Sequence, residues 1–248
     1  MRLLILGGTT EASALARRIA GRPDLDPVLS LAGRTRSPMS PAIPFRVGGF
    51  GGVDGLKAYL IDNDVNAVVD ATHPFAAQMS RNAAAACRDL AVPLAVLTRP
   101  AWRWQMGDRW TRVDDIEAAV RALGEIPRRV FLTIGGLQLA TFALAPQHHY
   151  VVRTIDHPKT IGSLPSHHLI LARGPFRVED EIALMRNEHV DVLVTKNSGG
   201  AATRAKIEAA RVIGIEVIMV ERPPPEAVPG FDSVENVLAW VDVHRPSP

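Results

Sequence analysis

Residues 3–21, LLILGGTTEASALARRIAG, decide the fold of this protein. An aliphatic run ends at Gly7 and Gly8, and a helix-like segment follows directly. A buried strand, a glycine turn and a helix in this order are typical of dinucleotide-binding α/β domains. Against the fingerprint G-x-G-x-x-G/A, Gly7 and Ala12 match the first and last positions, whereas Thr9 replaces the middle glycine.

Thr9 changes how this turn can hold a phosphate. The middle glycine of the fingerprint lets the backbone approach the pyrophosphate, so a threonine must either displace the phosphate or contact it through its hydroxyl. The hydroxyls of Thr9 and Thr10 can make that contact beside the free N–H groups at the start of the helix. We therefore expect Gly7, Gly8, Thr9 and Thr10 to bind a cofactor phosphate, with a ligand-free strand, turn and helix as the alternative.

Short aliphatic runs alternate with helix-like segments along nearly the whole chain. Continuously apolar runs are typical of strands buried on both faces, and such strands form parallel sheets with crossover helices. We therefore predict the α/β class, with two Rossmann-like domains and a ligand cleft between them. The runs are residues 3–6, 28–32, 67–71, 94–98, 129–135, 150–154, 168–172, 191–196 and 216–221.

The stretch TRPAWRWQMGDRWTRVDD, residues 98–115, separates two sets of runs and contains three of the four tryptophans. It has no clear hydrophobic period, so we place the domain boundary within Pro100–Asp114. The predicted domains are an NADP-binding domain of residues 1–106 and a substrate-binding domain of residues 107–248. The tryptophans either pack between the domains or stack on a flat ligand. The segment SVENVLAWVDV is predicted to be the last helix, capped by Ser233.

The composition of the 248 residues narrows the classes of function. Hydrophobic residues make up 47% and charged residues 22%, as in ordinary globular proteins, and the single cysteine, Cys87, cannot form an internal disulfide. A net charge of +2 with scattered arginines argues against a nucleic-acid surface, and no apolar run is long enough to span a bilayer. We predict a reduced, cytoplasmic protein that binds an anionic small molecule, and its oligomeric state is left open.

The second aliphatic run ends in LAGRTRSP, which carries Arg34, Arg36 and Ser37. NAD enzymes place an acidic residue at this strand end for the ribose hydroxyls, whereas arginine there accommodates a 2′-phosphate. The loop therefore favours NADP over NAD, and also over S-adenosylmethionine. A solvated basic loop is the alternative.

The third run ends in DATHPFA, with Thr72 and His73 at its carboxyl end. Ligands of open α/β sheets lie outside these strand ends, so we expect both residues to face the nicotinamide half of the cofactor. A helix is expected to begin near Pro74. His73 is either a proton carrier or a turn histidine satisfied by the backbone.

Two later runs also end in glycine turns. Lysine occurs only four times in the chain, so a lysine at a strand end is informative. Backbone donors and a cation can converge on an anion at such a turn. The alternative for the second turn is a helix entry capped by Ser198, with the lysine in solvent. The turns are LTIGG, with Gly135 and Gly136, and VTKNSGG, with Lys196, Asn197, Ser198 and Gly199.

The eight histidines include two adjacent pairs, His148–His149 and His167–His168, but no H-E-x-x-H or C-x-x-C spacing is present. Adjacent residues on a strand point to opposite faces. We therefore expect no metal site.

The motifs ILGGTTEA, DATHPFA, TIGG and TKNSGG, in this order and at these strand ends, resemble those of the precorrin-6A reductase family of cobalamin biosynthesis. The resemblance runs from Met1 to about Pro223. It implies reduction of a double bond of the precorrin macrocycle with NADPH, with hydride delivered to ring carbon C19 and a proton to C18. It also implies a tetrapyrrole partner with carboxylate side chains, which suits an arginine-rich protein.

Under this resemblance, the loops of the second domain meet the substrate. The candidate proton or electrostatic groups are Lys196 and His73, with water as a rival. The candidate substrate-binding residues are Gly135, Gly136, Asn197, Ser198 and Gly199.

The sequence excludes one other class of enzyme and leaves two other functions open. A short-chain dehydrogenase needs Y-x-x-x-K, but Asn63 follows Tyr59 at the lysine position and Thr154 follows Tyr150, so that class is excluded. A non-catalytic NADP-sensing module stays open, as does reduction of the cobalt-containing analogue of the substrate.

Overall fold

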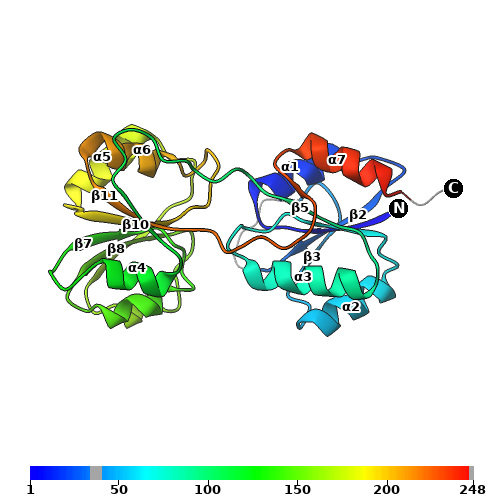
Figure 1. Cartoon of the computed structure of the whole chain (residues 1–248), viewed down its shortest axis with the longest axis horizontal. Helices are drawn as coiled ribbons and strands as arrows, with labels where there is room; N and C mark the ends of the chain where they lie inside the picture. The colour runs from blue at the N-terminus through cyan, green and yellow to red at the C-terminus, as the bar shows by residue number, and fades with distance from the viewer. Residues whose placement is uncertain (34–40, 246–248) are drawn as a thin grey trace. The chain divides into compact units, whose positions relative to one another are not determined.

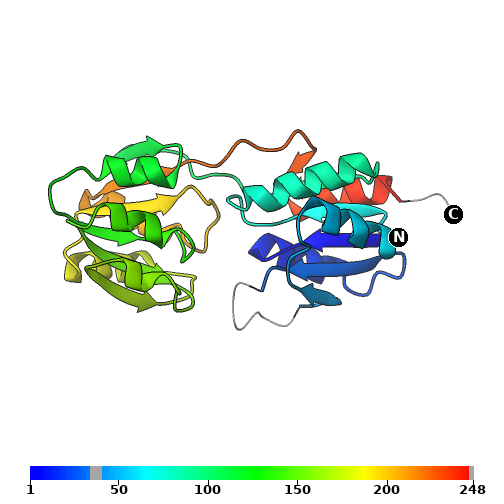
Figure 2. The same ribbon diagram turned by 90° about the horizontal axis from the view of Figure 1, so that it is seen from below.

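The computed structural model describes residues 1–33 and 41–245, and the chain forms two compact units. Unit 1 comprises Met1–Pro100 together with the segment from Pro223 onward, and unit 2 comprises Ala101–Arg222. The chain therefore passes between the units twice, through the two connecting segments visible in Figures 1 and 2.

Unit 1 contains a sheet of six parallel strands in the spatial order β3-β2-β1-β4-β5-β12. This is the strand order of a doubly wound dinucleotide-binding fold. The progression of strands reverses between β1 and β4, which makes this position the topological switch point. The strands are β1 (Arg2–Leu6), β2 (Asp26–Leu31), β3 (Phe45–Val47), β4 (Ala67–Asp70), β5 (Leu94–Leu97) and β12 (Gly230–Phe231).

Unit 2 contains a second sheet of six parallel strands, in the order β9-β8-β7-β10-β11-β6. Strands β7 to β11 follow the same spatial order as the first five strands of unit 1. The remaining edge position is taken by β6, the first strand after the chain enters unit 2. The switch point lies between β7 and β10. The strands are β6 (Trp110–Val113), β7 (Arg129–Leu132), β8 (His149–Thr154), β9 (His167–Leu171), β10 (Val192–Lys196) and β11 (Glu216–Val220).

Helices cover both faces of each sheet, as Figure 1 shows. In unit 1, one face carries α1 (Thr10–Ile19) and α7 (Val234–Val243), and the other carries α2 (Val53–Asp62) and α3 (Ala77–Asp89). In unit 2, one face carries α5 (Val178–Asn187) and α6 (Ala205–Ile213), and the other carries α4 (Ile116–Ala122) with the 3-10 helices η1 (Leu139–Leu144) and η2 (Ile161–Ser163).

Strand β1 shows why continuous apolar runs form these sheets. Leu3 and Ile5 pack into the core beneath α1 and α7, whereas Leu4 and Leu6 pack into the separate core beneath α2 and α3. All four side chains are at most 2% exposed. Because successive side chains of a strand point to opposite faces, a strand covered on both sides needs an apolar residue at every position.

The predicted α/β class with two parallel sheets is confirmed, and each of the nine predicted runs overlaps a strand. Three of the four edge strands, β3, β6 and β12, correspond to no predicted run, whereas the fourth, β9, is predicted. Strand β6 has the sequence WTRV and leaves Thr111 and Arg112 exposed, and β12 has only two residues. Edge strands need no continuous apolar run, because they are not covered as central strands are.

The observed units differ from the predicted division into residues 1–106 and 107–248 in two respects. The first crossing lies between Pro100 and Ala101, at the start of the predicted range Pro100–Asp114 and ahead of the boundary after residue 106, and the segment from Pro223 returns to unit 1. Helix α7 is capped by the Ser233 hydroxyl, which accepts from the N–H of Asn236 at 3.2 Å, as predicted, but it packs against α1 in unit 1. The predicted ligand cleft between the domains stays a prediction.

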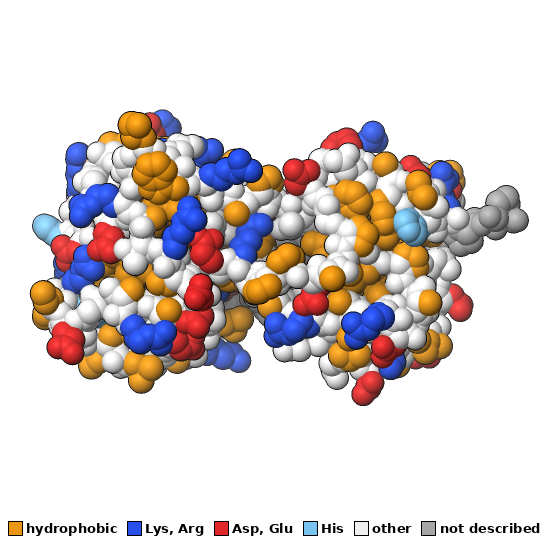
Figure 3. All heavy atoms as spheres, in the orientation of Figure 1, with side chains coloured by type: hydrophobic (Ala, Val, Ile, Leu, Met, Phe, Trp, Pro, Cys, Tyr) orange, Lys and Arg blue, Asp and Glu red, His pale blue; other side chains and the backbone are white. Residues whose placement is uncertain are grey.

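Charged side chains of both signs are interspersed on the face drawn in Figure 3. Within the described ranges, no helix has the length and apolar character needed to cross a membrane. Cys87 is buried in α3, as expected for a structural thiol, and burial together with the charge of Asp70 raises its pKa to about 12.

Candidate functional site

The predicted site residues that the structure describes lie at the two switch points. In unit 1, the turn after β1 (residues 7–10) and the loop after β4 (residues 71–73) leave neighbouring strands at their carboxyl ends. In unit 2, the loops after β7 (residues 133–136) and β10 (residues 197–200) do the same. In doubly wound sheets, ligands bind outside the carboxyl ends of the strands at this position.

Gly7 and Gly8 each have a distinct structural reason. A Cβ on Gly7 would lie 2.5 Å from the Leu29 side chain and 3.3 Å from that of Ala12, so glycine permits close packing of strand, turn and helix. Gly8 has φ +113°, and a Cβ there would meet no atom within 4 Å. Its backbone thus adopts a conformation that favours glycine and borders open space. The turn has the exposed backbone that a phosphate site requires.

The hydroxyl of Thr9 is engaged within the protein. It donates to the carbonyl of Ala71 at 2.7 Å and accepts from the N–H of Ala12 at 3.1 Å, so it caps α1 and joins the turn after β1 to the loop after β4. A hydroxyl has one proton to donate. While the bond to Ala71 is kept, the hydroxyl has no proton to donate to a pyrophosphate, whereas the backbone N–H of Thr9 stays a candidate donor. The predicted contact of Thr9 with a cofactor phosphate stays a prediction. The exposed Thr10 hydroxyl donates to Glu11 at 3.0 Å.

Glu11 and Arg99 form an ion pair that the sequence analysis missed. Arg99 follows β5 and donates to Glu11, in the first turn of α1, at 2.8 Å. Burial alone would raise the pKa of Glu11, but a backbone hydrogen bond and the charge of Arg99 hold it below its ordinary value. Glu11 is therefore a neutralised anion beside the glycine turn, and this neutralisation keeps the turn compatible with a phosphate.

The loop after β4 is organised by a buried carboxylate. Asp70 is 2% exposed and accepts from the N–H of Thr72 at 3.0 Å, the hydroxyl of Thr72 at 2.7 Å and the hydroxyl of Ser80 at 2.5 Å. The Thr72 hydroxyl proton is thus already used. While this bond is kept, the hydroxyl can act toward a ligand only as an acceptor.

His73 has the backbone contact that its alternative interpretation required. Its Nδ1 accepts from the N–H of Phe75 at 3.2 Å, and its carbonyl accepts from Ala76 at 2.7 Å. An accepting Nδ1 puts the proton of the neutral ring on Nε2. The helix expected near Pro74 begins at Ala77, after this turn.

Arg34, Arg36 and Ser37, the predicted 2′-phosphate residues, lie outside the described residues.

The loop after β7 contains Gly135, at φ +83°, and Gly136. A Cβ on Gly136 would lie 2.8 Å from that of Pro158, and the Gly136 carbonyl accepts from the Thr160 hydroxyl at 2.8 Å. The predicted glycine turn is thus packed against the loop that follows β8, and Gly135 is its exposed part.

In the loop after β10, the side chain of one predicted site residue, Asn197, is buried. Asn197 is 3% exposed, and its Oδ1 accepts from the N–H of Trp102 at 2.8 Å. Its Nδ2 donates to the Trp102 carbonyl and to Glu221 Oε2, each at 3.2 Å. Its side chain is therefore bonded within the interior of unit 2, and the predicted substrate contact of Asn197 stays a prediction.

The neighbours of Asn197 also differ from the alternative of a capped helix entry. Helix α6 begins at Ala205, well after Ser198, and has no side-chain cap. Lys196 is the half-buried last residue of β10, and Gly199 is buried at φ +68°. Lys196, Ser198 and Gly199 thus belong to one built loop at the switch point of unit 2.

Trp102 belongs to unit 2. It is 9% exposed, packs in the core beneath α5 and α6, and donates from its indole to the Gly200 carbonyl at 2.9 Å. Lys206 Nζ lies 5.0 Å from its ring centroid.

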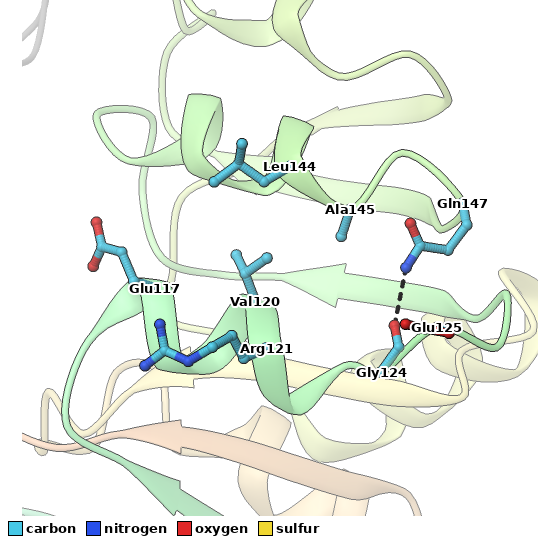
Figure 4. A pocket seen from close by; sticks show the side chains of 8 residues that line it. All are labelled: Glu117, Val120, Arg121, Gly124, Glu125, Leu144, Ala145 and Gln147. Carbon is cyan, nitrogen blue, oxygen red and sulfur yellow. Dashed lines mark hydrogen bonds between the residues drawn. The ribbon is translucent and has the colours of Figure 1, made fainter.

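A shallow hollow in unit 2 lies apart from these loops. Figure 4 shows its lining from α4, the end of η1 and the segments that precede β7 and β8, with Gln147 donating to the Gly124 carbonyl at 2.9 Å. These segments lie at the amino ends of the strands, opposite the switch-point loops. Among the residues that the structure describes, no group of three or more His, Cys, Asp and Glu side chains is placed to hold a metal ion.

Two doubly wound parallel sheets, each with a glycine turn at its switch point, define a ligand-binding α/β protein of the Rossmann class. The family model described as "Precorrin-6x reductase CbiJ/CobK" matches residues 2–242. The chain therefore belongs to the precorrin-6x reductase family. This membership confirms the predicted enzyme class, a reductase of cobalamin biosynthesis that acts on a CH–CH group.

Individual relatives match this chain over nearly all of their length. A precorrin-6A reductase of Rhodobacter capsulatus is 49% identical and covers 100% of this chain and 98% of its own. One from a Sinorhizobium species is 52% identical, with 96% and 91% covered. The solved structure of "CobK precorrin-6A reductase" matches with a TM-score of 0.92 and 48% identity, covering 100% of this chain and 98% of its own. A cobalt-precorrin-6A reductase of Priestia megaterium is 29% identical, with 95% and 96% covered.

Proposed function

We propose that this chain reduces precorrin-6A with NADPH, delivering hydride to ring carbon C19 and a proton to C18. The observation that carries the proposal is the pair of glycine turns at the two switch points, in a chain of the precorrin-6x reductase family. One switch point suits the phosphates of a nucleotide, and the other carries a lysine suited to a carboxylate-bearing ring.

The turn after β1 fits the cofactor. Open space borders the backbone of Gly8, the N–H groups of the first turn of α1 are aligned by the Thr9 cap, and Arg99 neutralises the nearby Glu11. NADPH supplies the hydride when bound. We assign its phosphates to the backbone of Gly7, Gly8, Thr9 and Thr10, because the Thr9 hydroxyl is already in use.

Arg34, Arg36 and Ser37 are proposed to select NADPH over NADH, on the sequence argument alone. Thr72 is proposed as a hydrogen-bond acceptor for the nicotinamide half, since its own proton goes to Asp70. His73 is proposed to act, if it moves a proton, through Nε2, since Nδ1 accepts from the backbone.

The loops at the switch point of unit 2 are proposed to meet the macrocycle. Gly135 and Ser198 are proposed to contribute backbone to this surface. The buried Gly199, at φ +68°, shapes the loop, and Gly136 packs against Pro158. Lys196 is proposed to stabilise charge or supply the proton to C18, with water as the rival donor.

The metal-free macrocycle is proposed over its cobalt-containing analogue. The precorrin-6A reductases of Rhodobacter capsulatus and Sinorhizobium, at 49% and 52% identity, are far more similar to this chain than the cobalt-precorrin-6A reductase of Priestia megaterium, at 29%. A non-catalytic NADP sensor is the second candidate, and steady turnover excludes it. A cytoplasmic location stays a prediction from composition.

The test is a rate assay of the purified protein with precorrin-6A and with cobalt-precorrin-6A, each with NADPH and with NADH. We expect steady oxidation of NADPH with the metal-free ring and a much lower rate with NADH. Lys196→Ala is expected to leave NADPH affinity within a few-fold but to lower turnover or substrate affinity by roughly 10- to 1,000-fold. NADPH binding without turnover of either ring would support the sensor, and a fully active Lys196→Ala variant would remove Lys196 from the mechanism.

A further inference from the structure

The loop that follows β10 is bonded to the residues where the chain enters and leaves unit 2. Trp102 is the second residue of unit 2, which begins at Ala101, and Glu221 and Arg222 are its last two residues before the chain leaves it. Asn197 contacts two of these residues at once, because its Oδ1 and Nδ2 bind the N–H and the carbonyl of Trp102 while Nδ2 also donates to Glu221.

The backbone of the same loop is held from both sides as well. Arg222 donates from Nε to the carbonyl of Asn197 and from a terminal nitrogen to that of Ser198, each at 2.9 Å. The indole of Trp102 donates to the carbonyl of Gly200 at 2.9 Å. The backbone carbonyls of Asn197, Ser198 and Gly200 thus accept hydrogen bonds from residues at the entry and exit of unit 2.

The hydrogen-bond inventory of Asn197 leaves it no donor for a ligand. An amide nitrogen has two N–H groups, and both are used, one on the Trp102 carbonyl and one on Glu221. Since the side chain is 3% exposed, its role toward a substrate is indirect. A buried and fully satisfied amide fixes one geometry, because any shift leaves buried polar groups without partners.

Lys196 is the residue that this arrangement fixes most directly. It pairs with Val220 in the register of β10 and β11, and the N–H of the next residue, Asn197, donates to the Val220 carbonyl at 2.8 Å. We propose that Asn197 is a positioning residue that holds Lys196 in its reactive place by joining the loop to Trp102 and Glu221. The inference rests on the role given to Lys196 in the proposed function.

The test uses Asn197→Asp, which keeps the shape of the side chain but sets an oxygen against the Trp102 carbonyl and Glu221. At pH 8 we expect turnover to fall on the order of 10- to 100-fold, because small displacements of a reactive group have effects of this size. NADPH affinity is expected to change by less than about two-fold, because the first turn of unit 1 is untouched. At lower pH the introduced carboxyl is protonated and donates again, so the turnover ratio of variant to unmodified protein is expected to rise.

A double-variant cycle then identifies the residue through which Asn197 acts. In the Lys196→Ala background, Asn197→Asp is expected to cause little further loss of turnover, because effects through one group are not additive. Asn63→Asp is the matched control. It removes an amide that donates to the Tyr59 carbonyl at 2.9 Å in unit 1, and turnover is expected to be unchanged.

Three results would overturn the inference. Unchanged turnover in a folded Asn197→Asp protein would make the amide merely structural. An equal loss in both backgrounds would show that it does not act through Lys196. Full activity of Lys196→Ala would refute the inference together with the catalytic role of that lysine, whereas impaired Lys196→Ala with active Asn197→Asp refutes the inference alone. If Asn197→Asp does not fold, Trp102→Phe, which removes the indole donor to Gly200 and shortens the buried ring but keeps the backbone groups that bind Asn197, goes through the same cycle.

Discussion

The hydroxyl of Thr9 joins two segments that are 62 residues apart in the chain, because it caps α1 and donates to the Ala71 carbonyl. The glycine of the usual fingerprint has no side chain to make either bond. Threonine therefore lacks the open backbone that glycine would leave at this position. Its hydroxyl instead holds the turn after β1 and the loop after β4 in a fixed relation. At the scale of single residues, Thr9 thus stabilises the glycine turn through hydrogen bonds within unit 1.

Thr9→Val is expected to lower the free energy of unfolding by about 1–2 kcal/mol, through loss of the helix cap and of the bond to Ala71. Urea denaturation followed by circular dichroism measures this change. Thr9→Ser, which keeps the hydroxyl, is the control and is expected to lose much less. If Thr9→Val left stability unchanged and weakened only NADPH binding, the hydroxyl would be a cofactor ligand after all.

At the scale of elements, the strand β8 begins beside a buried histidine. His148 is 1% exposed, its Nδ1 accepts from the N–H of Arg128 at 3.2 Å, and its Nε2 lies 3.1 Å from the Gly124 carbonyl. Burial, assisted by the charge of Arg128 and opposed by the Gly124 bond, lowers the pKa of His148 below its ordinary value. The neutral ring thus joins the segments that precede β7 and β8.

Because the pKa of His148 is lower in the folded protein, the unfolded chain binds the proton more readily. Its stabilising contribution is complete above the ordinary pKa of 6.5 and is lost as the pH falls below that value, by at most about 1.4 kcal/mol per pH unit. Thermal unfolding between pH 8 and pH 5 measures the slope. His148→Gln, which does not titrate, is expected to flatten it.

His149 is the neighbouring control, because burial and the charge of Arg129 also lower its pKa but its ring bonds Ser166 at the surface. His149→Gln is expected to remove the contribution of His149 to the slope and to leave that of His148 in place. Equal slopes in the unmodified protein and in His148→Gln would assign the pH dependence to other groups.

At the scale of the whole molecule, the two crossings of the chain decide which segments stabilise which unit. Helix α7 comes last in the sequence, yet Val237 and Val241 are fully buried in the core of unit 1 with Leu3 and Leu15. Unit 1 therefore completes its fold only after all of unit 2 has been made.

Val241→Asp is expected to destabilise unit 1 by about 3 kcal/mol or more, because it buries an unpaired charge. Limited proteolysis with mass spectrometry is expected to show new cleavage within residues 1–100 and little change within residues 101–222. Val243→Asp, on the same helix but at a position that is 80% exposed, is the matched control and is expected to behave like the unmodified protein. Cleavage appearing first in unit 2 would contradict the assignment of α7 to unit 1.

The sequence by itself determined the fold class, the central strands and the positions of the site loops. Each of these is encoded locally, because a strand covered on both faces is apolar at every residue and a turn at its end needs glycine, as at Gly8 and Gly135. Only the tertiary structure decided that α7 completes unit 1, that Arg99 neutralises Glu11, and that Asn197 faces the interior. The place of α7 depends on the second crossing of the chain. The partner of Glu11 is 88 residues away in the chain, and the Trp102 partner of Asn197 is 95 residues away. A local sequence pattern does not specify such distant partners. An asparagine whose buried amide is fully hydrogen-bonded therefore cannot be told from a ligand-binding asparagine by sequence alone.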